Sequence, residues 1–90
     1  MHFEWDAGKA AANLRKHGVS FEEAATAMRD DFAATVRDPD HSANEARFIT
    51  FGLSSAGRLL LVSHTEREEH IRIISTRLAT KVERKIYEEG

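Results

Sequence analysis

The chain has 90 residues, and its 13 Lys and Arg against 15 Asp and Glu give a net charge of −2 at pH 7. Hydrophobic residues at 41% and charged residues at 31% are usual for a globular protein, and the length fits one domain over residues 1–90. Cysteine is absent, which excludes disulfides and thiolate metal sites. No apolar run approaches the ~20 residues of a membrane-spanning helix, and the acidic start does not resemble a signal peptide, so we expect a cytoplasmic protein.

Two helices are predicted in the first third of the chain. Asp6 is a suitable N-cap for a helix over residues 7–17, and Gly18 is suited to end it. Ser20 and Glu23 form a capping box, in which each side chain satisfies a free backbone amide at the start of the second helix. Apolar residues at helical spacing then give this helix a face for the core: Phe21, Ala24, Ala25 and Met28.

The middle of the chain is predicted to form strands. Residues 3–5 indicate a short strand or an extended lead-in, and residues 32–36 indicate a modest strand. Residues 38–42 carry turn-forming side chains and predict a loop. Stronger strands are predicted over three further ranges, 47–53, 58–65 and 70–77, and their connections of about four residues make them antiparallel hairpins.

A second capping box, Thr80 with Glu83, predicts a C-terminal helix. The order of elements is therefore helix, helix, strands and helix. Hairpin strands with helices segregated around them make a small α+β domain. We expect an antiparallel sheet of three or four strands with two N-terminal helices and one C-terminal helix.

The turn lengths predict which side chains face each other in the sheet. Turns of four residues place Phe51 opposite Leu60 and Arg47 opposite His64. Arg47 and His64 are then neighbours at one end of an apolar face, with Arg67 in the adjacent turn. A slip of one residue in either hairpin would exchange the faces.

This group suggests chemistry on a phosphate. Nearby arginines disfavour a protonated imidazole, which suits His64 to act as a general base. Arg47 and Arg67 suit the charge of a phosphorus-centred transition state. The alternative is that Arg47 and His64 are polar edge residues against solvent.

Other candidates each have a plainer alternative. Lys16 could complement the helix dipole, Arg72 could be a solvated charge, and Tyr87 could half-cover the core. His41 follows Asp38 and Asp40, but no metal-ligand spacing supports a site there, and a loop that caps itself is the simpler interpretation. We expect no metal and no cofactor.

Blocks of sequence with a specific order and spacing run through nearly the whole chain. The first half contains FEWD at residues 3–6, KA at 9–10, NL at 13–14 and KHGVSFEEA at 16–24. The second half contains EARFI at 45–49, RLLLV at 58–62, HTER at 64–67 and IRIISTR at 71–77, then AT at 79–80, ER at 83–84 and YE at 87–88. Together these blocks resemble the BrnT family of toxins.

The resemblance implies a compact RelE-like ribonuclease of a type II toxin–antitoxin system, which cleaves RNA, blocks translation and arrests growth. It also implies a BrnA-type antitoxin of the ribbon–helix–helix class, which neutralises the toxin and represses the shared operon. Operator DNA would then be bound only through the antitoxin. The implied activity depends on the matches at Arg47, His64, Arg67, Arg72 and Arg77.

We therefore expect RNA cleavage without a metal, in which His64 takes the proton of a 2′-hydroxyl that attacks the neighbouring phosphorus. Arg47, Arg67 and Arg77 are expected to stabilise the added charge. Lys16, Arg72 and Tyr87 are candidates for RNA binding or proton transfer. The alternative is a non-catalytic interaction module whose arginines bind an acidic partner. The low net charge and the lack of a helix-turn-helix signal count against a DNA-binding regulator.

Overall fold

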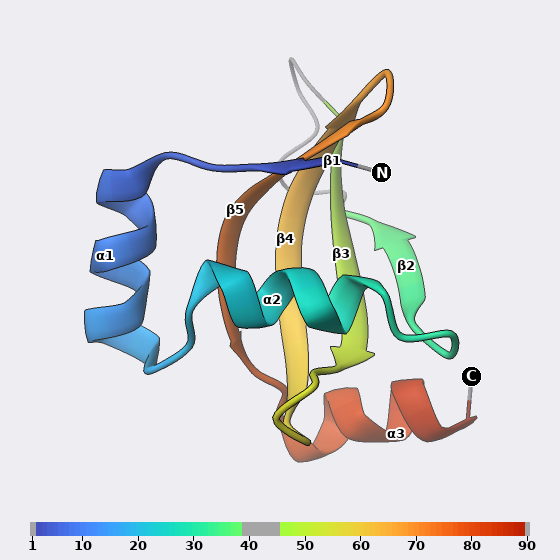
Figure 1. The fold of residues 1–90 in the computed structure, drawn as a ribbon. Coiled ribbons are helices and arrows are strands. Elements are labelled where there is room, and N and C mark those ends of the chain that lie inside the picture. The colour runs from blue at the N-terminus through green and yellow to red at the C-terminus, as the bar shows by residue number, and fades with distance from the viewer. Residues whose placement is uncertain (1, 39–45, 90) are drawn as a thin grey trace.

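A computed structural model describes residues 2–38 and 46–89, and within these residues three helices surround a five-stranded sheet (Figure 1). The elements are β1 (His2–Glu4), α1 (Ala7–His17), α2 (Phe21–Met28), β2 (Ala34–Arg37), β3 (Arg47–Leu53), β4 (Leu59–Arg67), β5 (His70–Leu78) and α3 (Lys81–Glu89). The strand order is β1-β5-β4-β3-β2. Of the loop predicted over 38–42, only Asp38 is described, so the candidate His41 lies outside the described residues.

The predicted helix caps are confirmed. The Asp6 carboxylate accepts a hydrogen bond from the Lys9 amide at 3.1 Å, and the Ser20 hydroxyl accepts one from the Glu23 amide at 3.0 Å. Gly18 ends α1 in the left-handed conformation, with φ of 69°, which glycine adopts without strain. At α3, the Glu83 amide donates to the Thr80 hydroxyl at 3.2 Å, and the Thr80 amide donates to the Glu83 carboxylate at 2.8 Å.

The sheet is larger than expected and is mixed. The α+β class is as predicted, but β1 forms a fifth strand that pairs with β5 in parallel. Parallel strands need a long crossover rather than a tight turn, so no hairpin signal in the sequence marks this pair. The expectation of an antiparallel sheet of three or four strands was therefore wrong on both points.

The predicted register was also wrong. Phe51 pairs with Leu61, and Arg47 pairs with Thr65, one residue away from the expected partners. The reason is turn length, since residues 54–58 form the first turn and only residues 68–69 form the second. Glu68 adopts φ of 54° to close that short turn, and a β-bulge between Ser63 and His64 shifts the register along β5.

The core lies between α2 and one face of the sheet. Figure 1 shows α2 running across β5, β4 and β3, with α1 beside the β5 edge. A Cβ atom on Gly52 would lie 2.2 Å from the carbonyl oxygen of Ala27, so α2 can approach β3 this closely only over a glycine. The buried residues of this cluster are Val19, Phe21, Ala24, Ala25, Ala27, Leu60, Val62 and Ile73.

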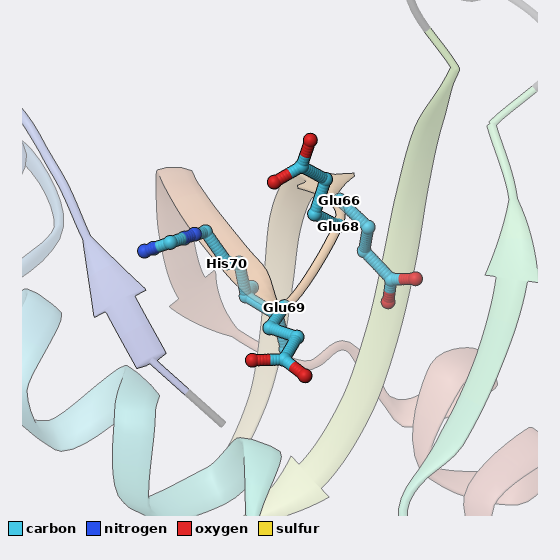
Figure 2. Close-up of a pocket in the computed structure, with 5 residues that line it drawn as sticks. Glu66, Glu68, Glu69 and His70 are labelled. Atoms are coloured by element: carbon cyan, nitrogen blue, oxygen red, sulfur yellow. The ribbon is translucent and has the colours of Figure 1, made fainter.

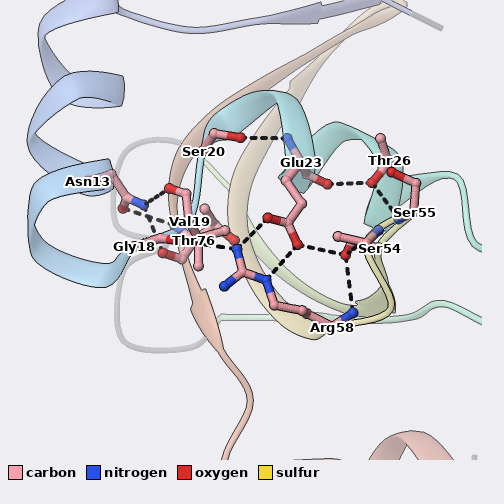
Figure 3. Close-up of polar contacts among 11 residues, drawn as sticks. Asn13, Gly18, Val19, Ser20, Glu23, Thr26, Ser54, Ser55, Arg58 and Thr76 are labelled. Carbon is pink, nitrogen blue, oxygen red and sulfur yellow. Dashed lines mark hydrogen bonds and ion pairs between the residues drawn. The ribbon is translucent and has the colours of Figure 1, made fainter.

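Polar ties hold the helices to the sheet (Figure 3). Arg58 donates to the Glu23 carboxylate through both Nε and Nη2, and the Ser54 hydroxyl donates to the same carboxylate at 2.7 Å. The hydrogen bond from Arg58 holds the pKa of Glu23 below its usual range. These contacts fasten α2 to the turn between β3 and β4.

Asn13 completes the β5 edge where β1 ends. Its side-chain amide donates to the Thr76 carbonyl at 2.9 Å and to the Val19 carbonyl at 3.0 Å, and its oxygen accepts from the Thr76 amide at 3.1 Å (Figure 3). The side chain therefore replaces a strand neighbour for Thr76 and joins α1 to β5. Buried backbone groups left without such partners are costly, so this single residue secures the edge.

Candidate functional site

Several arginines share one face of the sheet. Residues paired across neighbouring strands point to the same face, and so do residues two apart along a strand. Arg47, Thr65 and Arg72 form one row across β3, β4 and β5. Arg67 lies two residues beyond Thr65 on β4 and shares their face.

Arg77 belongs to the same face through Leu61. Arg77 pairs with Leu61, which lies four residues before Thr65 on β4. Ser63 and Ser75 pair between the two rows. We call this side of the sheet the arginine face, defined by Arg47, Arg67, Arg72 and Arg77. It lies opposite the face that α2 covers.

Carboxylates hold two of these arginines in place. Arg72 Nη1 donates to Glu4 Oε2 at 3.1 Å across the β1–β5 pair. Arg77 makes a bidentate contact with Glu83, at 2.8 and 2.9 Å, which raises the pKa of the Arg77 guanidinium. Such pairs order long side chains without removing their charge.

In the row of Arg47, Thr65 and Arg72, two side chains lack polar partners among the described residues. Arg47 makes no ion pair with any residue in 2–38 or 46–89. Thr65 is 2% exposed, and its hydroxyl finds no hydrogen-bond partner among the described residues. The Arg47 guanidinium and the Thr65 hydroxyl therefore have hydrogen-bonding positions that no described residue fills.

His64 lies on the other face and is not a neighbour of Arg47. Its side chain is 0% exposed, Phe48 stacks on its ring, and its Nε2 lies 2.8 Å from the Thr50 hydroxyl. Burial lowers the pKa of His64 to about 4, so the imidazole is neutral at pH 7. Its Nδ1 lacks a hydrogen-bond partner within the described chain, with Glu66 Oε1 3.8 Å away.

The other predicted residues lie apart. Lys16 lines an open pocket between α1 and β5. Tyr87, on α3, donates a hydrogen bond to the Asp30 carboxylate, which raises the pKa of Tyr87 and ties α3 to the end of α2. The same carboxylate accepts from the Leu53 amide at 2.9 Å. The structure thus places the arginines on one face of the sheet, and His64 lies on the other face.

Two histidines that sequence reasoning missed belong to the arginine face. His70 pairs with Arg67 across the β4–β5 turn, and His2 lies opposite His70 on β1. Their rings stack, with centroids 5.5 Å apart, and both side chains are exposed. The alternation of His70 with Arg72 on one strand was a usable signal for His70. His2 gave none, because it depends on the parallel pairing of β1.

A second pocket, of about 380 Å³, lies at the β4–β5 turn and is acidic. Figure 2 shows the carboxylates of Glu66, Glu68 and Glu69 around it, with the His70 ring pointing toward β1. Three carboxylates repel phosphate, so the part of this pocket that they line does not suit RNA, although His70 also lines the pocket. Within residues 2–38 and 46–89, no group of three or more His, Cys, Asp or Glu is arranged to hold a metal ion.

Comparison with known proteins identifies the family. Residues 5–83 match the family described as "Ribonuclease toxin, BrnT, of type II toxin-antitoxin system". The chain belongs to the BrnT family. The resemblance seen in the sequence is thereby confirmed, and the protein is a ribonuclease toxin of a type II toxin–antitoxin system, with RNA as its substrate and a cognate antitoxin as its partner.

The fold has a counterpart of known structure. The 1.1 Å crystal structure of the Brucella abortus ribonuclease toxin, BrnT, aligns with a TM-score of 0.65 and 23% sequence identity. The alignment covers 90% of this chain and 99% of that chain, so the two share the same fold. A comparison with curated protein sequences finds no match. No helix in the described parts of the chain is long and apolar enough to cross a membrane.

The burial of His64 predicts a specific pH dependence of stability. Its pKa is lowered from 6.5 to about 4, so the unfolded chain binds a proton more readily than the folded one. The contribution of neutral His64 to the free energy of unfolding is fully present above pH 6.5 and is lost as the pH falls from 6.5 toward 4. At pH 5 the free energy of unfolding should be about 2 kcal/mol lower than it would be with a residue that does not titrate at this position.

Urea unfolding at pH 7.5 and pH 5 measures this dependence. We expect His64→Gln to lose less stability between the two pH values than the wild type. His70→Gln, at an exposed histidine, is the control and should behave as the wild type. An equal loss in His64→Gln and wild type would show that His64 does not titrate as its burial requires.

Proposed function

We propose that this toxin cleaves RNA on the arginine face. The observation that carries the proposal is the convergence of Arg47, Arg67, Arg72 and Arg77 on the side of the sheet opposite α2. The planar guanidinium matches the geometry of phosphate oxygens, and four of them create a local anion site in a chain of net negative charge. Membership in a ribonuclease family does not support a non-catalytic interaction module, the alternative left open by the sequence.

The chemistry we propose needs no metal. A base removes the proton of a 2′-hydroxyl, and this oxygen attacks the neighbouring phosphorus. The bond from phosphorus to the 5′-oxygen of the next nucleotide then breaks, and an acid protonates that oxygen. The products are a 2′,3′-cyclic phosphate and a free 5′-hydroxyl. The arginines stabilise the charge that gathers on the phosphoryl oxygens.

We assign the proton transfers to His70 rather than to His64. Histidine changes charge near neutral pH, which suits it to general acid–base catalysis. His70 is exposed and shares a row with Arg67, whereas His64 is fully buried on the other face. His2, stacked on His70, is placed to serve as the second proton-transfer group. The role of His64 as general base stays a prediction, and substitutions at both histidines test it against His70.

Chelation tests the metal-free mechanism. Purified toxin should degrade RNA in excess EDTA at its normal rate, because the attack depends only on side chains. Mass spectrometry of the fragments should find 2′,3′-cyclic or 3′-phosphate ends. Activity that chelation abolishes and magnesium restores would contradict the mechanism.

Single substitutions test the site. Arg47→Ala and Arg72→Ala should lower kcat by about 10²–10³, the usual cost of removing one electrostatic donor. His70→Gln should lose activity to a similar extent, and His64→Gln should retain most of it. The matched control is Arg84→Ala, which removes an exposed arginine from α3.

Melting temperatures measured on the same samples separate loss of activity from loss of folding. If Arg47→Ala and Arg72→Ala cleave RNA as fast as the control, the active site lies elsewhere. If His64→Gln is inactive although folded and His70→Gln is active, His64 is the general base and the assignment to His70 is wrong.

We further propose that cleavage blocks translation and arrests growth, and that the cognate antitoxin is a DNA-binding BrnA-type protein. Its carboxylates would cover the arginine face, and an interface of this kind usually buries more than about 2,000 Å². The complex should be inactive on RNA, melt well above the free toxin and bind operator DNA. Mobility-shift assays should find no specific operator binding by the toxin alone, and such binding would contradict this division of labour.

A further inference from the structure

The pocket between α1 and β5 has a composition suited to a nucleotide. Its cavity volume is about 230 Å³, and α1 lines it with one helical face, since its residues recur at spacings of three and four. The main lining residues are Lys9, Asn13, Lys16 and His17 from α1 and Ile74 and Ser75 from β5. None of its lining residues in the described parts of the chain carries a carboxylate. The two lysines, about 10 Å apart along α1, thus line one side of the pocket, and the apolar Ile74 and the hydroxyl of Ser75 line the other.

The β5 wall of the pocket is a local departure from the regular sheet. Ser63 pairs with Ser75, but the next residue of β4, His64, pairs with Ile73. Ile74 is therefore the extra residue of the β-bulge, without a partner on β4. A bulge re-aims the side chain it carries, and Ile74 lines the pocket. An apolar surface there can pack against a base while the lysines contact phosphates.

Asn13 fixes the opposite wall. Its side-chain amide is already bonded to the carbonyls of Val19 and Thr76 and to the Thr76 amide. It therefore sets the distance between α1 and β5 and leaves ligand contacts to the lysines. The spacing of the pocket is built into the fold.

The pocket adjoins the arginine face. Ser75 lies between Arg72 and Arg77 along β5, in the row it shares with Ser63. β1 pairs with β5 only as far as Arg72, so beyond that residue the β5 edge is bordered by α1. A single strand lying on the arginine face can continue over this edge to reach Lys9 and Lys16.

From this arrangement we infer that the α1–β5 pocket is a subsite for a nucleotide of the RNA flanking the cleaved bond. Lys9 and Lys16 bind backbone phosphates, and Ile74 supports the base. The inference rests on the proposed cleavage of RNA on the arginine face. It adds a second contact region, which longer substrates occupy and a dinucleotide does not reach.

Binding of an uncleavable RNA tests this subsite directly. The probe is a 2′-O-methyl RNA of about ten nucleotides, labelled for fluorescence anisotropy. The double variant Lys9→Ala/Lys16→Ala should bind it at least about tenfold more weakly, and the slope of log K against log salt should fall by about 1.4, the value for two phosphate contacts on single strands. Lys81→Ala/Lys85→Ala removes the same charge from α3 and should bind as the wild type.

Kinetics provide a second readout. The double variant should raise KM far more for the long RNA than for a dinucleotide, with kcat retained on both. Unchanged affinity and salt slope in Lys9→Ala/Lys16→Ala would overturn the subsite while leaving the arginine face untouched. Loss of kcat on both substrates would also overturn it, since the lysines would then belong to the catalytic centre.

Antitoxin binding by the same double variant separates an RNA subsite from a protein-binding site. If Lys9→Ala/Lys16→Ala binds RNA normally but binds the antitoxin more weakly, the pocket is a protein-binding site and the inference is wrong. Failure of the proposed function has a different signature, in which Arg47→Ala and Arg72→Ala retain both RNA affinity and activity.

Discussion

The close contact between α2 and β3 is the constraint that orients the whole sheet. Gly52 lets the Ala27 backbone lie against the strand, at a distance that any residue with a Cβ atom would prevent. With α2 seated there, Leu60, Val62 and Ile73 are buried beneath it. Because side chains alternate along a strand, their neighbours in sequence must point the other way. The position of α2 therefore decides which face of the sheet it covers, and we propose that RNA binds on the other face.

Polar contacts keep this arrangement in a chain without disulfides. Glu23 binds Arg58 and Ser54 near the start of α2, and Asp30 binds Leu53 and Tyr87 just beyond its end. Each carboxylate thus receives donors from elements distant in the sequence. A 90-residue chain buries only a modest core, so such ties have a large share in its specificity of fold.

The two faces of the sheet differ in how their polar side chains are bonded. On the face covered by α2, hydrogen bonds link the buried His64 and Thr50 to the exposed Thr35. On the other face, Arg47 has no ion pair within the described residues, while Glu4 and Glu83 position their arginines. The β-bulge at Ile74 adds a wall for the α1–β5 pocket. The proposed catalytic groups and the flanking subsite then lie along one continuous path.

Local signals in the sequence predicted most of the elements. Caps at Asp6, Ser20 and Thr80 depend on a few neighbouring residues, and each lies where the pattern placed it. The same holds for the hairpin strands, whose alternation is visible without any tertiary contact. The family resemblance then supplied the ribonuclease function, which the residue chemistry alone left open.

Features that depend on distant parts of the chain were not predictable in this way. The pairing of Arg47 with Thr65 follows from the length of the turn between β3 and β4, and an error of one residue there moved His64 to the wrong face. The parallel pairing of β1 brings its histidine beside that of β5 without any local mark in the sequence. The arginines were nonetheless chosen as candidates from their residue type, because guanidinium chemistry does not depend on the register, and their role in the site stays a prediction.

A crystal structure with an RNA whose attacking 2′-hydroxyl is replaced by hydrogen would locate the cleavage site. This substrate keeps every phosphate but cannot form the cyclic product. We predict that the uncleaved phosphate lies on the arginine face, within hydrogen-bonding distance of Arg47 or Arg72. A phosphate bound on the face covered by α2, or against an opened His64, would contradict cleavage on the arginine face.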